Sequence, residues 1–356
     1  MNNGLIKYNK IGILGGSFDP IHFGHLEAAE AVRAKHGLDA IMLLPAGKPA
    51  FKQDKEMATA EQRYEMCKLA ISDGYPSFFV SRAEIDRGGI TYTIDTLRKF
   101  KQEMPSTELF FIVGTDAAQN FSKWRNADEI LKLCTLIEMP RKDSDISSTM
   151  VRDAVKNIEP LNGLVPFKVE KYIVMNGLYN THLQGVAAEA VALGRHFDFN
   201  DEKLAKIRKT AFLHDNAKSF CKTATFEEIS EICNRGGYFL EDFFIDNKSI
   251  AHCYAGAVLA KEEYGIDDIE ILDAIASHTF GEPNMTLFQK IIYLVDFFEP
   301  NRPQNEAIRT AKKLAYEDID RAMAYVLKYT IEYNEKKGKA VHPLSVKALE
   351  FYQRGE

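Results

Sequence analysis

The sequence lacks any long apolar run. Its longest purely hydrophobic stretches, such as Leu109 to Val113, are far shorter than the ~20 residues that span a bilayer. Met1 to Lys10 has neither the apolar core nor the cleavage site of a secretory signal. No C-x-x-C pair occurs among the five cysteines, which argues against a disulfide framework and a cysteine zinc site. These absences predict reduced thiols and a cytoplasmic location.

The chain also lacks an excess of basic charge. Its 45 Lys and Arg residues face 51 Asp and Glu residues, and the net charge is -6. This balance provides no electrostatic footprint for nucleic acid. We therefore expect small-molecule partners, with neither nucleic acid nor a membrane among them. The length of 356 residues predicts two domains, and the 46% hydrophobic content is typical of globular proteins.

The first half alternates short apolar runs with helical segments. The runs predicted as strands are Ile11 to Leu14, Ala40 to Leu44, Phe78 to Val80, Leu109 to Val113 and Thr135 to Ile137. This alternation predicts a doubly wound parallel α/β sheet of the Rossmann-like kind. Ligands bind such sheets at the carboxyl ends of the strands. We therefore expect the ligand-binding loops at residues 15–19, 45–52 and 114–116.

The second half reads as all α. From Thr181 onward apolar residues recur at helical spacing, as in Leu183, Val186, Ala190 and Leu193. Asn176-Gly177 stops the preceding helix, predicted over 167–175. We therefore place the domains at 1–178 and 179–356.

A glycine-rich loop follows the first predicted strand and leads into a helix. It reads Gly15-Gly16-Ser17-Phe18-Asp19-Pro20-Ile21-His22-Phe23-Gly24-His25. The two histidines share a face near the helix start, where free N–H groups favour phosphate. An isolated histidine pair could equally be a cap and a core residue. The order of strand, glycines, proline and histidines favours a triphosphate site, although neither a P-loop nor a dinucleotide fingerprint is present.

This loop resembles the (T/S)-F-x-P-x-H-x-G-H signature of the nucleotidyltransferase superfamily. A second superfamily signature, I-S-S-T-x-x-R, is matched by Ile146-Ser147-Ser148-Thr149-Met150-Val151-Arg152. Over residues 10–179 the chain looks most like nicotinate-nucleotide adenylyltransferases, through segments 44–52, 91–97, 110–116, 123–124 and 176–179. That family transfers AMP from ATP to nicotinate mononucleotide and releases pyrophosphate.

The resemblance implies specific site residues. ATP would be bound by Gly15, Gly16, Ser17, Phe18, His22, His25, Gly114, Asp116, Ser147, Ser148, Thr149 and Arg152, with His22, His25 and Arg152 in catalytic roles. Nicotinate mononucleotide would contact Lys52, Thr93 and Trp124. In-line transfer of this kind needs positioned cations and Mg²⁺ more than a covalent nucleophile.

Two departures from the family pattern leave alternatives open. Ala46 and Phe51 replace an Asn and a His of the pyridine-site loop, and only Arg141 to Asp145 stand where the family has a longer stretch. One alternative is a nucleotide-sensing first domain that regulates the second. Another keeps both folds but changes the nucleotides on which they act.

Six histidines and aspartates are distributed among the predicted helices of the second half. They are His182, His214, Asp215, His252, His278 and Asp296. Their wide spacing places them on separate helices, which can converge on a metal in a bundle core. Imidazole and carboxylate donors without thiolates suit Mn, Fe, Ni, Co or Zn. Each alone could be a satisfied core residue, but burying the whole set is costly without a metal or a network.

The order H, HD, H, H, D resembles that of HD-domain phosphohydrolases. Residues 181–351 look like the YqeK-type branch, through segments 214–218, 259–266, 277–279, 296–302 and 342–344. That branch contains symmetrical dinucleoside tetraphosphatases, which cleave diadenosine tetraphosphate to two ADP. The resemblance implies that the six residues bind Fe or Mn in two sites that share Asp215, the first with His182, His214 and Asp296 and the second with His252 and His278. It also implies that Asp215 and Lys218 are catalytic, that Lys218 and Arg302 hold polyphosphate, and that the protein forms a homodimer. The sequence thus predicts a bifunctional enzyme.

Overall fold

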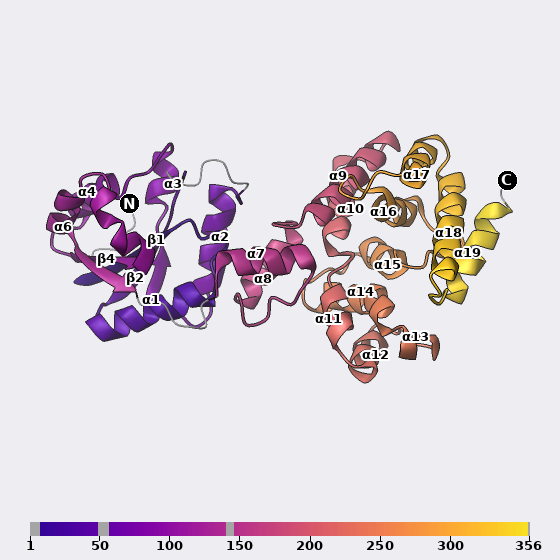
Figure 1. Ribbon diagram of the computed structural model, residues 1–356, viewed down its shortest axis with the longest axis horizontal. Coiled ribbons are helices and arrows are strands. Elements are labelled where there is room, and N and C mark those ends of the chain that lie inside the picture. The colour runs from indigo at the N-terminus through magenta and orange to yellow at the C-terminus, as the bar shows by residue number, and fades with distance from the viewer. Residues whose placement is uncertain (1–7, 49–56, 140–145, 355–356) are drawn as a thin grey trace. The chain divides into compact units, whose positions relative to one another are not determined.

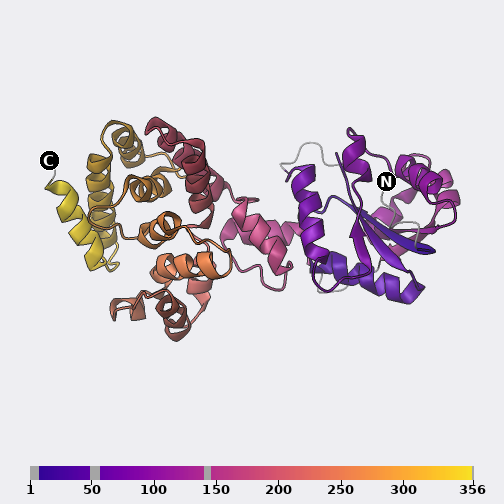
Figure 2. The ribbon, with the colours of Figure 1, turned by 180° about the vertical axis from the view of Figure 1, so that it is seen from behind.

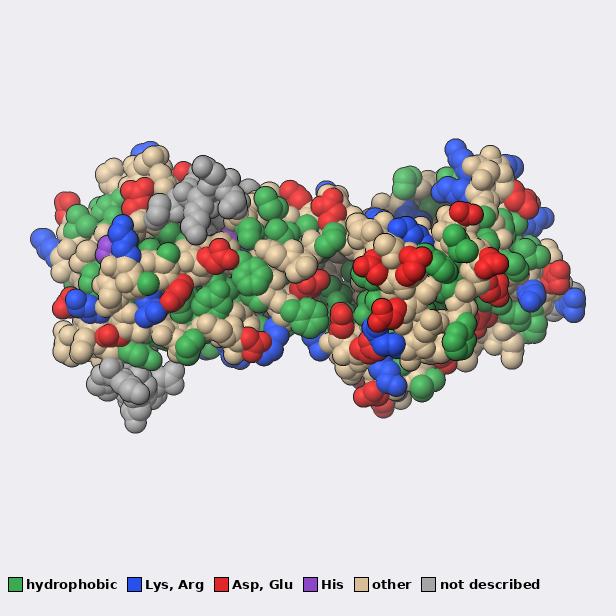
Figure 3. Space-filling view, turned by 90° about the horizontal axis from the view of Figure 1, so that it is seen from below, with side chains coloured by type: hydrophobic (Ala, Val, Ile, Leu, Met, Phe, Trp, Pro, Cys, Tyr) green, Lys and Arg blue, Asp and Glu red, His purple; other side chains and the backbone are tan. Residues whose placement is uncertain are grey.

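The computed structural model of the chain describes residues 8–48, 57–139 and 146–354. The chain divides into two compact units, the first comprising 1–155 with 161–172 and the second 156–160 with 173–356. Among the described helices, none is both long enough and apolar enough to cross a membrane. On the face displayed in Figure 3, acidic and basic side chains are interspersed.

The first unit is built on a parallel sheet of five strands in the order β3-β2-β1-β4-β5. The strands are β1 (Lys10–Gly16), β2 (Ala40–Pro45), β3 (Phe78–Val80), β4 (Glu108–Gly114) and β5 (Thr135–Met139). In the centre, Ile13 pairs with Met42 of β2 and with Phe111 of β4. The predicted doubly wound parallel sheet is confirmed.

Helices cover both faces of this sheet (Figures 1 and 2). On one face, Ile11 and Ile13 share a core with α4 (Thr93–Glu103) and α6 (Ala127–Leu133). On the other face lie α1 (Phe23–His36) and α2 (Ala60–Ile71), which contact β2. Gly12 has no room for a side chain, because a Cβ there would lie 2.7 Å from Ile41. The remaining helices of this half are α3 (Ala83–Arg87), α5 (Thr115–Gln119), η2 (Phe121–Lys123), α7 (Ser148–Asn157) and α8 (Phe167–Met175).

The described part of the second unit is helical, as predicted. Its helices are α9 (Thr181–His196), α10 (Asp201–Leu213), α11 (Lys218–Thr223), α12 (Phe226–Arg235), α13 (Phe243–Asp246), η3 (Lys248–Ala251), α14 (His252–Glu262), α15 (Ile269–Ser277), α16 (Leu287–Phe298), α17 (Glu306–Glu317), α18 (Ile319–Lys336) and α19 (Pro343–Gln353). The central helix is α16, which contacts α9, α10, α15, α17 and α18.

The sequence of α16 explains its central position. Apolar residues occupy most of its circumference, and Phe288, Ile291, Ile292, Leu294 and Val295 are buried completely. A helix that is apolar all round is stable only inside a core. Asp296 is therefore a half-buried carboxylate that follows the fully buried Leu294 and Val295 on this helix.

Candidate active sites

The loop after β1 ends in a helix start that carries both predicted histidines. His22 is the N-cap of α1, and its ring lies against that of His25 with 3.6 Å between the ring centroids. Gly24, between them, is close to the second signature, because a Cβ there would lie 3.2 Å from the carbonyl oxygen of Ile146. The close approach of two backbones explains why this position is glycine.

The two signatures contact each other directly. The Ser148 hydroxyl donates a hydrogen bond to the carbonyl oxygen of Pro20 at 2.8 Å. Arg152 donates through Nη1 to the carbonyl oxygen of Asp19 at 2.5 Å, and the same nitrogen lies 3.8 Å from the Asp19 carboxylate. Two helix starts, two imidazoles and a guanidinium therefore gather at one place, which suits an anionic phosphate chain.

Other residues of the second signature shape its helix. Ser147 accepts a hydrogen bond from the backbone N–H of Met150 at 3.1 Å, as an N-capping side chain does. Thr149 accepts one from the Arg152 guanidinium, also at 3.1 Å. Both contacts hold the first turn of α7 and orient Arg152.

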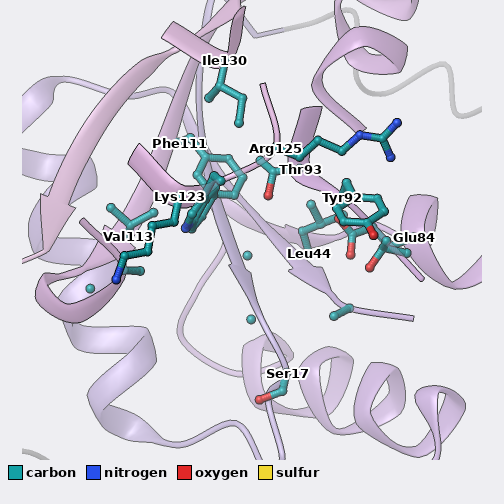
Figure 4. Close-up of a pocket in the computed structure, with 17 residues that line it drawn as sticks. Ser17, Leu44, Glu84, Tyr92, Thr93, Phe111, Val113, Lys123, Arg125 and Ile130 are labelled. Atoms are coloured by element: carbon teal, nitrogen blue, oxygen red, sulfur yellow. The ribbon is translucent and has the colours of Figure 1, made fainter. Parts of the chain in front are cut away.

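A cavity of about 420 Å³ opens at the carboxyl ends of β1, β2 and β4. Figure 4 shows Ser17 at one side of it and Thr93, Arg125 and Phe111 at the other. The predicted residues that line it are Gly15, Gly16, Ser17, Thr93, Gly114 and Trp124. The half-buried Trp124 is held edge-on against Phe111, with ring centroids 6.0 Å apart. The cavity offers an aromatic wall and polar groups together.

The remaining predicted residues of this half lie elsewhere. The Phe18 ring is 1% exposed and meets His25 edge-on. Asp116 is exposed near the start of α5. Lys52, Phe51 and the connection 141–145 lie outside the described residues.

Sequence reasoning missed Arg63, which joins two of the site loops. Its side chain is 2% exposed and donates to the carbonyl oxygens of Ser17 at 2.7 Å, Gly47 at 2.9 Å and Ala58 at 3.1 Å. The loops after β1 and β2 are thus tied to one guanidinium. The helical spacing of Arg63 with the buried Met66 and Cys67 was the signal available in the sequence.

Glu84 is a buried carboxyl in the wall of this cavity and accepts a hydrogen bond from the Thr96 hydroxyl at 3.0 Å. Burial raises the pKa of Glu84, and hydrogen bonds from Thr91 and Thr96 offset only part of that rise. The folded state therefore favours the neutral form. Stability from this group is present at low pH and is lost as pH rises through the raised pKa.

We expect Glu84→Gln to unfold at higher denaturant concentration than the wild type, by a margin that grows between pH 4 and pH 8. Glutamine keeps an acceptor for Thr96 but carries no charge to bury. Denaturant unfolding at several pH values measures the margin, with the exposed Glu103→Gln as control. A margin independent of pH would contradict the prediction.

In the second unit, five helices bring the six predicted metal-binding residues together. His182 lies in the first turn of α9, His214 and Asp215 follow α10, and His252 opens α14. His278 is the C-cap of α15, and Asp296 lies on α16. These residues converge although they are far apart in the sequence.

The donor atoms form two groups that share Asp215. In the first, His182 Nε2 lies 3.4 Å from Asp296 Oδ1, and His214 Nε2 lies 3.5 Å from Asp215 Oδ2. His182 Nε2 is also 3.9 Å from Asp215 Oδ2. In the second, Asp215 Oδ1 lies 3.2 Å from His252 Nε2 and 3.6 Å from His278 Nε2. Each oxygen of Asp215 therefore faces a different group, as a carboxylate bridging two metal ions would.

The outer nitrogens of three histidines are already bonded. Nδ1 of His214, His252 and His278 lies 2.8, 2.9 and 2.7 Å from the carbonyl oxygens of Ala211, Ser249 and Ile275. An Nδ1–H that donates to a carbonyl leaves the Nε2 lone pair pointing inward, as in metal-binding histidines. Among the described residues, His214 Nε2 has no hydrogen-bond partner. The residues therefore fit a metal centre.

The ionisation of the cluster suits metal binding too. Burial lowers the pKa of His214 to about 4 and lowers that of His252. Burial alone would raise the pKa of Asp215, but His214, hydrogen bonds from His252 and His278, and Lys218 hold that pKa well below its usual range. Neutral imidazoles and ionised carboxylates are the forms that bind metal ions.

Two cations adjoin these carboxylates. Lys218 Nζ lies 2.7 Å from Asp215 Oδ2, and Arg302 Nη2 lies 2.8 Å from Asp296 Oδ1. Both side chains are partly exposed, so a bound anion can reach them. The structure thus places the two predicted polyphosphate-binding residues beside the donor groups.

Glu299, which the sequence reasoning did not single out, supports His182. It is 2% exposed, and its Oε1 lies 3.2 Å from His182 Nδ1. Its Oε2 accepts a hydrogen bond from the Asn301 backbone N–H at 2.7 Å. Gly185 makes room for it, because a Cβ there would lie 2.4 Å from Oε2. The position of Glu299 three residues after Asp296 was the available sequence signal.

We expect Glu299→Gln to weaken metal binding by about 10- to 100-fold, the usual cost of losing a carboxylate behind a histidine ligand. Gly185→Ala should weaken it as well, because the added methyl group displaces Glu299. Calorimetric titration with Mn²⁺ measures the affinity, and the exposed Glu306→Gln is the matched control. Wild-type affinity in both test variants would refute the role of Glu299.

Known protein families match both halves of the chain. Residues 13–154 match the cytidylyltransferase-like family, and residues 179–301 match the HD domain. A Moorella thermoacetica protein named as a probable nicotinate-nucleotide adenylyltransferase is 38% identical, over 52% of this chain and 98% of its own length. The nicotinate-nucleotide adenylyltransferase of Bacillus subtilis is 39% identical, over 48% of this chain and 99% of its own length.

A solved structure from Clostridium acetobutylicum, described as a predicted HD superfamily hydrolase involved in NAD metabolism, is 34% identical to this chain. The match covers 54% of this chain and 98% of that one, with a TM-score of 0.47.

The fold and the family matches define a nucleotidyltransferase unit followed by an HD-domain unit. The chain belongs to the nicotinate-nucleotide adenylyltransferase family and carries an HD domain in its second half.

Proposed function

We propose that the protein is a bifunctional enzyme. Its first unit transfers AMP from ATP to nicotinate mononucleotide, and its second unit hydrolyses diadenosine tetraphosphate symmetrically to two ADP with the help of divalent metal ions. The observation that carries the second activity is the position of Asp215 between two groups of histidine donors. The first activity is supported by the contact between the two signatures and by the named relatives.

In the transferase unit, the residues at the start of α1 and α7 would hold the phosphates of ATP with Mg²⁺. His22, His25 and Arg152 would stabilise the charge that develops as pyrophosphate leaves. The 420 Å³ cavity would take the pyridine nucleotide, with Trp124 against its ring and Thr93 near its carboxylate. The contribution of these residues is positioning and charge stabilisation, since adenylyl transfer needs no covalent nucleophile.

In the hydrolase unit, His182, His214, Asp215 and Asp296 would hold one metal ion, and Asp215, His252 and His278 a second. Iron and manganese suit this set of nitrogen and oxygen donors. When bound, such ions lower the pKa of a water molecule and neutralise phosphate charge. Lys218 and Arg302 would bind and orient the polyphosphate, which brings its central phosphates to the donor groups.

A second candidate function is that the first unit binds nucleotides without turnover and regulates the hydrolase. It is favoured by the short connection 141–145, which replaces a longer stretch of the family pattern. The two candidates differ in one measurable product, pyrophosphate.

The deciding experiment measures pyrophosphate release from the purified full chain supplied with ATP, Mg²⁺ and nicotinate mononucleotide. Release that depends on the acceptor and is lost in His22→Ala establishes the transferase. Hydrolysis of diadenosine tetraphosphate, followed in the same variant with Mn²⁺, should persist. Hydrolysis without any pyrophosphate release would favour the regulatory candidate, whereas a folded His22→Ala protein that had lost both activities would refute independent sites.

A further inference from the structure

A cavity of about 690 Å³ lies in the second unit beside the metal-binding residues. Its walls come from the segment 246–250, from Thr279 and Phe280, from Tyr293 on α16, from α18 and from the chain after α18. The volume falls within the roughly 300–1,000 Å³ of small-molecule sites. The proposed roles of the cluster leave this cavity without an occupant.

The cavity borders the second group of donor atoms. Thr279 lines it, and the Thr279 hydroxyl oxygen lies 3.4 Å from His252 Nε2 and 3.3 Å from His278 Nε2. Ser249, another lining residue, accepts the outer hydrogen bond of His252 through its carbonyl oxygen. A ligand with a phosphate at this group could therefore extend its remaining part into the cavity.

The lining indicates which part of a ligand fits. The buried Phe280, Tyr293 and Leu327 form apolar walls, and Thr330 and Asn334 add a few hydrogen-bonding groups. Among the described lining residues, only Asp246 and Lys339 carry full charges, and these are of opposite sign. Phosphate requires converging cations, which Lys218 and Arg302 provide at the cluster instead. The cavity therefore suits an uncharged, flat group with polar edges.

His342 adds to the wall of this cavity a hydrogen-bond donor that has no partner in the part of the chain that the structure describes. Its side chain is 9% exposed, and its ring stacks on Phe280 with 4.4 Å between centroids. Nδ1 accepts a hydrogen bond from the Leu344 backbone N–H, so Nε2 carries the proton. Burial lowers the pKa of His342, which keeps the ring neutral. Among the described residues, Nε2 has no hydrogen-bond partner, and such a buried donor calls for one.

We propose that this cavity is the nucleoside subsite of the hydrolase, holding the base and ribose of a nucleotide whose phosphates lie at the Asp215 cluster. The inference rests on the proposed hydrolase function and deepens it. It makes nucleotides, rather than inorganic polyphosphates or simple phosphate esters, the substrate class of this unit.

The test compares two tryptophan substitutions on α18 of the full chain. Thr330→Trp fills the cavity, whereas Glu332→Trp, two residues away, adds the same side chain at an exposed position outside the lining. Both are made in a His22→Ala background to weaken phosphate binding by the first unit. ADP and pyrophosphate are titrated separately by calorimetry in the presence of Mn²⁺.

We expect Thr330→Trp to lower the affinity for ADP at least about tenfold relative to Glu332→Trp, with pyrophosphate binding unchanged, because only the nucleoside is displaced. Equal ADP affinities in the two variants would overturn the proposal. A parallel loss of pyrophosphate binding would overturn it too. If Thr330→Trp no longer binds Mn²⁺, Asn334→Ala replaces it, with an expected threefold to tenfold selective loss of ADP affinity.

Failure of the nucleoside subsite and failure of the proposed tetraphosphatase activity give different results. A chain that fails to hydrolyse diadenosine tetraphosphate, but loses ADP selectively in Thr330→Trp, would retain the nucleoside subsite and need another nucleotide substrate. A chain that hydrolyses this substrate with the same KM in both tryptophan variants would retain the activity and lose the subsite.

Discussion

Replacing Arg63 with methionine should destabilise the first unit by about 3–6 kcal/mol. Methionine fills a similar volume but cannot donate to Ser17, Gly47 and Ala58. A buried carbonyl oxygen left without a donor costs roughly 1–3 kcal/mol, and the Ser17 and Gly47 bonds, which are only partly buried, fall in the lower part of that range. The loops after β1 and β2 would also lose the group that holds them together, so the affinity for ATP and nicotinate mononucleotide should fall.

Denaturant unfolding followed by tryptophan fluorescence measures this loss, because Trp124 is the single tryptophan of the chain and lies in the first unit. Arg82→Met is the matched control. Arg82 is partly exposed, forms ion pairs with the exposed side chains of Glu61 and Asp86, and lies over the Tyr64 ring. Solvent-exposed ion pairs of this kind contribute about 1 kcal/mol or less. Similar small losses in the two variants would show that Arg63 does not hold the loops.

Asp215→Asn should reduce hydrolysis by about a thousandfold or more, the scale of losing a principal charge-stabilising group. Both carboxylate oxygens of Asp215 face donor groups. An asparagine would turn an NH₂ group toward one set of histidines and would leave the other with a neutral oxygen. We therefore expect the bound metal to fall as well as the rate.

Metal content after equilibration with Mn²⁺ and ADP release from diadenosine tetraphosphate are the two measurements. Asp273→Asn, an exposed position on α15 near His278, serves as control and should match the wild type in both. Pyrophosphate release by the first unit should be unaffected. An Asp215→Asn protein with full metal content and full hydrolysis rate would refute the role of Asp215 as the carboxylate shared by the two donor groups.

Local patterns in the sequence predicted the main elements of the fold. The apolar runs that we interpreted as strands all lie in β1 to β5, and the helix predicted over 167–175 is α8. Such elements are predictable because strand and helix periodicities depend on residues close in the sequence. The parallel arrangement followed from the alternation of strands and helices.

The candidate sites were predictable where a residue type limits the chemistry. The sequence order of the histidines and aspartates indicated one cluster, and the structure brings all six residues together. The supporting residues were less evident. Arg63 and Glu299 are charged residues of common types, and their roles depend on which backbone or ring lies opposite them after folding.

The sequence by itself determined the two-unit organisation, the parallel sheet, the helical second half and the residue types that each site can use. Only the tertiary structure decided that Arg63 joins two loops, that Glu299 supports His182, and that a cavity borders His252 and His278. The physical reason is the separation along the chain over which each interaction acts. Periodicity and capping act between near neighbours, whereas these contacts join residues that only the packing of whole helices and strands brings within a few ångströms.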